Sequence, residues 1–287
     1  MLTAQPPSTP SSAPLITLHQ VGKRFDGGLQ ALAGVSLVVA AGEFVALLGP
    51  SGCGKSTVLR LAAGLDAPSA GTVTAPAVQA SASRMVSHSV SHTISHTISN
   101  STAFVFQEPT LMPWASVFDN VWLPLRLQGQ SRATASATVR QVLASVGLAD
   151  FDTAYPAQLS GGMKMRASIA RALVTQPQVL LMDEPFAALD DITRQRLNTD
   201  LLQWWQGKGM AALFVTHSVA EAVFLSQRVL VMAARPGRVV AEVAIDHPYP
   251  RHADFRHSAQ FAQACRTLGD ALVLANSDLA NGDLATR

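Results

Sequence analysis

The chain has 287 residues, of which 48% are apolar and 14% are charged, and its formal net charge is +2. This composition excludes a chain that is disordered throughout, and the scattered Lys and Arg residues exclude the dense basic surface expected of a nucleic-acid-binding protein. Two cysteines are too few for a disulfide framework and are typical of a reducing compartment, so we expect the cytoplasm.

Residues 1–14 are rich in Pro, Ser and Thr and lack the basic start and apolar run of a signal peptide, so we expect a disordered tail. The patterns that follow predict strands at 15–25, 34–40 and 43–49, and a helix at 55–65. The long apolar stretch in this region is interrupted by Gly42 and Glu43, which indicates two core strands and not a membrane span.

A glycine-rich turn lies between the third strand and the helix. Its sequence, "GPSGCGKST", matches the phosphate-loop pattern G-x-x-x-x-G-K-[ST] in the strand-to-helix context that the pattern requires. Backbone N–H groups in such a turn bind a β-phosphate, Lys55 neutralises the β- and γ-oxygens, and Ser56 offers its hydroxyl to Mg²⁺. We therefore expect ATP and Mg²⁺ to bind here, with the nucleotide contacted by Gly49, Pro50, Ser51, Gly52, Cys53, Gly54, Lys55, Ser56 and Thr57.

Residues 77–103 form a Ser- and Thr-rich segment of low complexity. Its repeat "SHSVSHTISHT" spaces His88, His92 and His96 four residues apart, so a helix or a strand would present them on one face. Two hypotheses compete: a Zn²⁺ or Ni²⁺ site, and a solvated insertion that could also form the edge of a β-hairpin. We favour the insertion, because no Cys or carboxylate lies within the repeat to complete a metal site.

Apolar residues at helical spacing predict a helical lobe over residues 110–173. Within it, "LSGG" places Ser160, Gly161 and Gly162 at the start of a helix, which would make a second anion-binding helix terminus. Taken alone, this segment is better interpreted as a glycine-rich helix cap.

The second half of the chain alternates strands with helices, which predicts a parallel sheet in an α/β fold. After residue 245 the pattern becomes polar and helical, so we expect a helical C-terminal extension over residues 246–287. The strand ending at Asp183 and Glu184 places both carboxylates at the sheet edge where such folds bind ligands. Asp183 would hold Mg²⁺, and Glu184 would act as the general base toward the attacking water. Gln107 and His217 also follow β-rich runs, so we expect them at the same edge of the sheet. Taken alone, Gln107 is better interpreted as a loop amide and His217 as a core histidine.

The order of these motifs, ending with "ALD" and His217, resembles the ATP-binding subunit of the ABC transporters over about residues 15–245. The resemblance implies a P-loop NTPase with a RecA-like core, an antiparallel β-subdomain and an inserted α-helical lobe. It also implies a head-to-tail dimer in which Ser160, Gly161 and Gly162 contact the γ-phosphate of the ATP held by the other copy.

The same resemblance implies individual roles. Phe25 would stack on adenine, for which a core phenylalanine is the alternative. Gln107 would touch Mg²⁺ and the attacking water, His217 would contact the γ-phosphate, and Asp190 would communicate across the dimer.

Four further segments, "LMPWASVFDNV", "ITRQRLN", "VMAARPGRV" and "PYPRHADFRHSAQF", are similar to the ATPases of nitrate, sulfonate and taurine importers. This similarity implies a peripheral subunit on the cytoplasmic face of the inner membrane, with permease subunits and, through them, a solute-binding protein as partners. Related importers carry thiamine precursors or other small organic solutes, so the cargo stays open. The alternative is a soluble ABC ATPase acting on nucleic acid, but the chain lacks the second phosphate loop or long coiled-coil insertion usual in such proteins.

Overall fold

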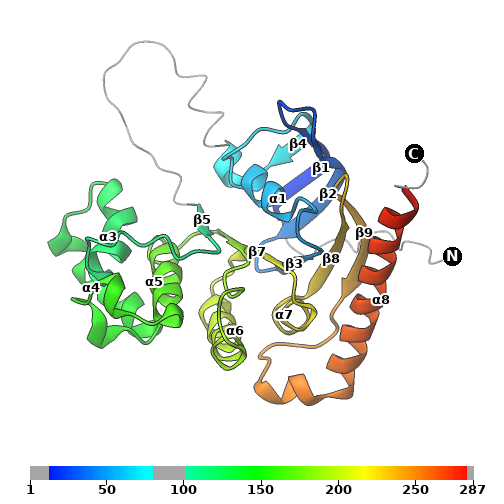
Figure 1. The fold of residues 1–287 in the computed structure, drawn as a ribbon. Coiled ribbons are helices and arrows are strands. Elements are labelled where there is room, and N and C mark those ends of the chain that lie inside the picture. The colour runs from blue at the N-terminus through cyan, green and yellow to red at the C-terminus, as the bar shows by residue number, and fades with distance from the viewer. Residues whose placement is uncertain (1–12, 80–100, 283–287) are drawn as a thin grey trace, which may run out of the picture.

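A six-stranded sheet forms the centre of the molecule, in the order β5-β6-β7-β3-β8-β9 (Figure 1). The computed structural model describes residues 13–79 and 101–282, so the histidine repeat and most of the predicted tail lie outside the described residues. The strands are β3 (Phe44–Leu48), β5 (Thr102–Val105), β6 (Val179–Asp183), β7 (Ala211–Thr216), β8 (Arg228–Ala233) and β9 (Arg238–Ala244).

The prediction of a parallel sheet is confirmed for the first five strands and wrong for β9, which pairs antiparallel with β8. Only residues 234–237 join these two strands. Such a short connection cannot make the crossover that a parallel pair needs, so it forms a hairpin.

The central strands are apolar without interruption because both faces of the sheet are covered. In β3, Phe44, Ala46 and Leu48 enter one hydrophobic core, while the alternating Val45 and Leu47 enter the other. The sheet therefore separates two hydrophobic cores, and packing on both faces fixes the positions of its strand ends.

The antiparallel β-subdomain is present, as predicted. It consists of β1 (Pro14–Arg24), β2 (Gln30–Ala40) and β4 (Ala70–Thr74), with β1 in the middle. This small sheet and helix α1 (Lys55–Ala62) share the second core with the central sheet (Figure 1).

The other face of the sheet carries the remaining helices, and three of them form a lobe at one side of the molecule (Figure 1). The lobe contains α3 (Val117–Leu127), α4 (Arg132–Ser145) and α5 (Gly161–Leu173). Helices α6 (Asp191–Trp205) and α7 (Val219–Leu225) lie beneath the sheet. Helix α7 was not predicted, because its seven residues are too few to show a helical period.

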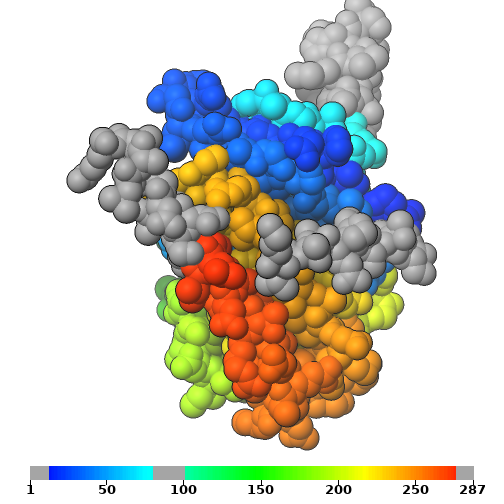
Figure 2. Space-filling view, turned by 90° about the vertical axis from the view of Figure 1, so that its right-hand side faces the viewer, coloured from blue at the N-terminus to red at the C-terminus, as the bar shows by residue number. Residues whose placement is uncertain are grey.

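A C-terminal unit follows β9 and consists of a 3₁₀ turn (Ala253–His257) and α8 (Ala259–Gly282). Helix α8 lies along the outside of the molecule and contacts α7, β8 and β9 (Figure 2). Of the helices in the described part of the chain, none has the length and hydropathy needed to span a bilayer.

Arg251 joins this C-terminal unit to the domain. Arg251 is 2% exposed, and its guanidinium donates hydrogen bonds to five backbone carbonyls in α7, in the residue that ends α7 and in the chain after β9. These carbonyls belong to Val223, Phe224, Ser226, Ile245 and His247.

We expect Arg251→Ala to lower the free energy of unfolding by about 2–4 kcal/mol, because it leaves buried carbonyls without donors. Chemical denaturation of the purified chain measures this change. Arg266→Ala is the control, since Arg266 is exposed on α8 and, among the described residues, its side chain donates a hydrogen bond only to Gln263. An Arg251→Ala chain as stable as the Arg266→Ala chain would contradict the assigned role.

Candidate functional site

A cavity of about 710 Å³ opens at the carboxyl edge of β3 and β6. This volume is typical of a site for a nucleotide-sized ligand. The cavity is lined by Phe25, Leu29, Gln30, Ala31, Ser51, Gly52, Gly54, Lys55, Ser56, Thr57, Gln107, Asp183, Glu184, Arg235 and Pro236.

The loop between β3 and α1 requires glycine at two positions, one because of its backbone conformation and the other because of a close contact. Gly54 has φ 91°, and a Cβ there would lie 2.6 Å from Leu32 Cδ2. At Gly49, a Cβ would lie 2.7 Å from the carbonyl oxygen of Met232. The loop is therefore packed tightly against β2 and β8, and residues 51, 52 and 54–57, which include the start of α1, line the cavity.

Lys55 is 5% exposed, yet its ammonium lies at the cavity wall. Its Nζ donates to the carbonyls of Gly49 at 2.9 Å and Pro50 at 3.0 Å, and lies 3.4 Å from Glu184 Oε1. The carbonyls and the carboxylate satisfy a charge that burial would otherwise disfavour.

Asp183 ends β6 and accepts a 2.9 Å hydrogen bond from the Ser56 hydroxyl. Burial raises the pKa of Asp183, and the bond from Ser56 acts in the opposite direction. With Gln107 in the same cavity, the site offers a hydroxyl, a carboxylate and an amide, and such oxygen donors fit Mg²⁺. Within the described residues, no group of three or more His, Cys, Asp or Glu side chains could hold a metal by itself.

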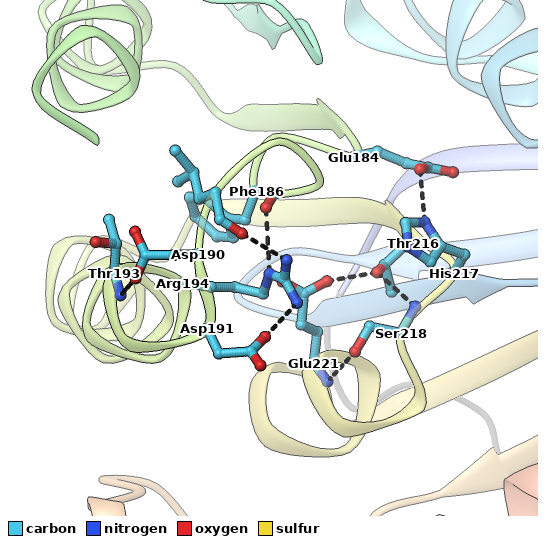
Figure 3. Close-up of polar contacts among 11 residues, drawn as sticks. Glu184, Phe186, Asp190, Asp191, Thr193, Arg194, Thr216, His217, Ser218 and Glu221 are labelled. Atoms are coloured by element: carbon cyan, nitrogen blue, oxygen red, sulfur yellow. Dashed lines mark hydrogen bonds and ion pairs between the residues drawn. The ribbon is translucent and has the colours of Figure 1, made fainter. Parts of the chain in front are cut away.

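Glu184 is held in a conformation that non-glycine residues rarely adopt, with φ 44°. Its N–H donates to the Val215 carbonyl at 3.0 Å, which fixes the turn after β6 to β7. Its carboxylate points to two neighbours: Oε1 faces Lys55, and Oε2 lies 2.8 Å from His217 Nδ1 (Figure 3). The structure thus brings together Glu184 and His217, which are 33 residues apart, and backbone strain at such a residue is typical of functional sites.

The comparisons with known proteins agree with this geometry. The sequence model of the ABC transporter family matches residues 32–187, which include the phosphate loop, Gln107 and both carboxylates. The chain belongs to the ABC transporter family.

Two relatives that are named for the solute they import show how close this membership is. The aliphatic sulfonates import ATP-binding protein SsuB of Yersinia pestis bv. Antiqua is 43% identical over 87% of this chain and 82% of its own length. The nitrate import ATP-binding protein NrtD of Synechocystis sp. is 43% identical over 79% of each chain.

A solved structure gives the same result for the fold. The dimeric, post-hydrolysis ATP-binding cassette MJ0796, bound to ADP and Pi, superposes with a TM-score of 0.67 at 29% identity, covering 81% of this chain and all of that one. The predicted family and the predicted P-loop NTPase fold are both confirmed.

The "LSGG" segment, residues 159–162, is called here the signature segment of this ABC cassette, and it does not line the cavity. Ser160 caps α5 by accepting the Met163 N–H at 3.3 Å, and a Cβ at Gly162 would lie 2.9 Å from Thr193 Cγ2. Asp190 caps α6 by accepting the Thr193 N–H at 2.9 Å, and this bond lowers the pKa of Asp190. The starts of α5 and α6 are therefore adjacent. Ser160, Gly162 and Asp190 form a second cluster of predicted site residues there, outside the cavity.

Three residues of the predicted phosphate-loop set, Gly49, Pro50 and Cys53, also lie outside the cavity lining. The Cys53 side chain is fully buried, and burial raises the pKa of its thiol. Within one chain, these residues shape the loop through packing and through the carbonyls that hold Lys55.

Sequence reasoning missed part of the cassette's cavity wall. Gln30 and Ala31 begin β2 and Leu29 directly precedes it, while Arg235 and Pro236 come from the β8–β9 hairpin. The hairpin reaches the phosphate loop so closely that a Cβ at Gly237 would lie 2.2 Å from the Cys53 carbonyl. The segment "VMAARPGRV" was noted only as a family feature, and nothing local in it indicates contact with a loop 180 residues away.

Proposed function

We propose that this chain is the ATP-binding subunit of an ABC importer and that its ATP hydrolysis drives uptake of a small solute of the nitrate or sulfonate type. The observation that carries the proposal is the single cavity in which the phosphate loop, Gln107, Asp183 and Glu184 meet. The relatives are import ATP-binding proteins for aliphatic sulfonates and for nitrate, which supports the transport direction and the solute class.

In this proposal the phosphates of ATP bind the glycine-rich loop, and Lys55 exchanges its carbonyl contacts for phosphate oxygens. Mg²⁺ would be held by Ser56, Gln107 and Asp183, and when bound it neutralises charge on the phosphates. Phe25, which is 42% exposed at the cavity wall, would offer its ring to adenine.

Glu184 would take the proton of the attacking water, and His217 would contact the γ-phosphate. The 2.8 Å contact between these two side chains would orient both toward the same phosphate. Lys55 lies on the other side of the Glu184 carboxylate, 3.4 Å from its Oε1.

The signature residues support the proposal of a head-to-tail dimer. Ser160, Gly161 and Gly162 lie outside the cavity of their own chain, so their helix terminus is available to the γ-phosphate bound by a second copy. Asp190 lies beside them and would meet the same second copy.

We expect Ser160→Arg to reduce ATP turnover by roughly 100-fold while leaving ATP affinity of the single chain within about threefold of wild type. The large side chain would block the approach of the second copy's phosphate without touching the chain's own cavity. Steady-state hydrolysis and calorimetric ATP binding separate the two effects. Equal losses of binding and turnover would contradict the assignment.

The loop after Gln107 is the surface we propose for the permease. Trp114 is 76% exposed on this loop, while Asn120 and Arg171 hold the loop in place through bonds to its backbone. A rigid loop that begins at the cavity and presents an exposed Trp can transmit the state of the nucleotide site to a membrane partner. This partner places the subunit on the cytoplasmic face of the membrane and, through the permease, connects it to a solute-binding protein.

Uptake by whole cells tests the proposed function. Cells lacking this gene should lose uptake of labelled methanesulfonate or nitrate, and the wild-type gene should restore it while the Glu184→Gln gene should not. Normal uptake of both solutes in the deletion strain would refute the proposed solute class.

A further inference from the structure

Arg194, on the first turns of α6, holds the segment that leads from the catalytic carboxylates to that helix. We call this segment the 186–191 loop. The Arg194 guanidinium donates to the Leu189 carbonyl at 2.6 Å, the Phe186 carbonyl at 3.2 Å and the Asp191 carboxylate at 2.9 Å (Figure 3). One planar side chain therefore fixes both ends of the 186–191 loop.

Glu221, in the first turn of α7, holds the residues on either side of His217. Its Oε2 accepts a 2.5 Å hydrogen bond from the Thr216 hydroxyl, and that hydroxyl in turn accepts the Ser218 N–H at 2.9 Å. The Glu221 N–H donates to the Ser218 hydroxyl at 3.4 Å. The backbone on both sides of His217 is thereby tied to one buried carboxylate, which is 6% exposed.

The two groups meet between helices α6 and α7. Arg194 Nε lies 4.0 Å from Glu221 Oε1, and this oxygen is buried without a hydrogen-bond partner in the described part of the chain (Figure 3). Burial raises the pKa of Glu221, while the Thr216 bond and the positive charge of Arg194 oppose that shift. Removing a carboxylate and a guanidinium from water costs free energy, which their mutual attraction repays only when further hydrogen bonds support the pair.

We propose that Arg194 and Glu221 are positioning residues that hold His217 and the Asp190 end of α6 at a fixed spacing for ATP hydrolysis. The inference rests on the proposed function. His217 is 56% exposed at its side chain, so its location depends on the backbone that Glu221 fixes and on its contact with Glu184. The pair joins that backbone to the 186–191 loop, so a movement of Asp190 against a second copy would be passed to His217.

The expected consequence is a loss of turnover without a loss of ATP binding. Glu221→Gln keeps the size of the side chain and the acceptor for Thr216 but removes the charge that faces Arg194. Because displacements of about 1 Å at a catalytic group can cost 100-fold, we expect kcat to fall by roughly 10- to 100-fold, with KM for ATP within about twofold.

A double-mutant cycle tests whether the two residues act together. Arg194→Lys keeps the charge but loses the fork that spans three acceptors, and the doubly substituted chain should be no slower than the slower single variant within about twofold. If the Glu221→Gln chain does not fold, the Arg194→Lys chain alone should show the same fall in kcat with a nearly unchanged KM for ATP.

The matched control is Glu43→Gln, which breaks a similarly enclosed pair, Glu43 with Arg228 at 2.5 Å, at the amino edge of the sheet. It should reduce stability and leave kcat unchanged. If the Glu221→Gln chain keeps the wild-type kcat, or if the two losses simply multiply, the inference is overturned. If the wild-type chain itself shows no ATP hydrolysis that Glu184→Gln abolishes, the proposed function fails instead.

Discussion

Replacing Glu184 with Gln is expected to slow ATP hydrolysis by about 10²- to 10⁴-fold, the usual contribution of a general base, while ATP affinity stays within about threefold of wild type. Gln is nearly the same size and can keep the contacts with His217 and Lys55, but it cannot take a proton from water. Single-turnover hydrolysis and equilibrium ATP binding measure the two quantities separately.

The control for Glu184→Gln is Asp270→Asn, because Asp270 is an exposed carboxylate on α8, far from the cavity. It should hydrolyse ATP at the wild-type rate. A Glu184→Gln chain that also turns over at this rate would remove Glu184 from the catalytic step.

Replacing Lys55 with Ala is expected to weaken ATP binding by roughly 10- to 100-fold, since one charge-assisted hydrogen bond is worth about 1.5–3 kcal/mol. Lys55 is the cation that the phosphate loop itself places at the cavity wall, and its ammonium already lies between two loop carbonyls and Glu184. Titration calorimetry with ATP and Mg²⁺ measures the loss.

Lys208→Ala provides the comparison, because Lys208 is an exposed lysine in the turn before β7, at the opposite edge of the sheet. Its ATP affinity should equal that of wild type. Equal affinities for the Lys55→Ala and wild-type chains would show that the loop does not bind phosphate through Lys55.

The sequence predicted the site where the chemistry is local. The phosphate loop is contiguous, and Asp183 and Glu184 follow directly from an apolar strand, so strand-and-turn rules were sufficient to place them at one edge. The two-core arrangement of β3 likewise follows from an uninterrupted apolar strand.

The remainder depends on contacts between distant segments. The Arg194–Glu221 pair joins two helices across 27 residues, and the β8–β9 hairpin supplies Arg235 to the cavity. Neither Arg194 nor Glu221 stands in a sequence pattern that indicates its partner, because an ion pair across packed helices leaves no period in the sequence. The direction of β9 was also missed, although the short connection before it is what decides that direction.

The most direct test of the account is the mass of the Glu184→Gln chain in solution, since the central claim is that ATP lies between the cavity of one copy and the signature segment of another. With ATP and Mg²⁺, sedimentation should give twice the 30.3 kDa mass of the chain, and without nucleotide it should give the single mass. Adding Ser160→Arg to the same chain should return it to the single mass in the presence of ATP. A Glu184→Gln chain that stays single at saturating ATP, or a dimer that Ser160→Arg leaves intact, would contradict the claim.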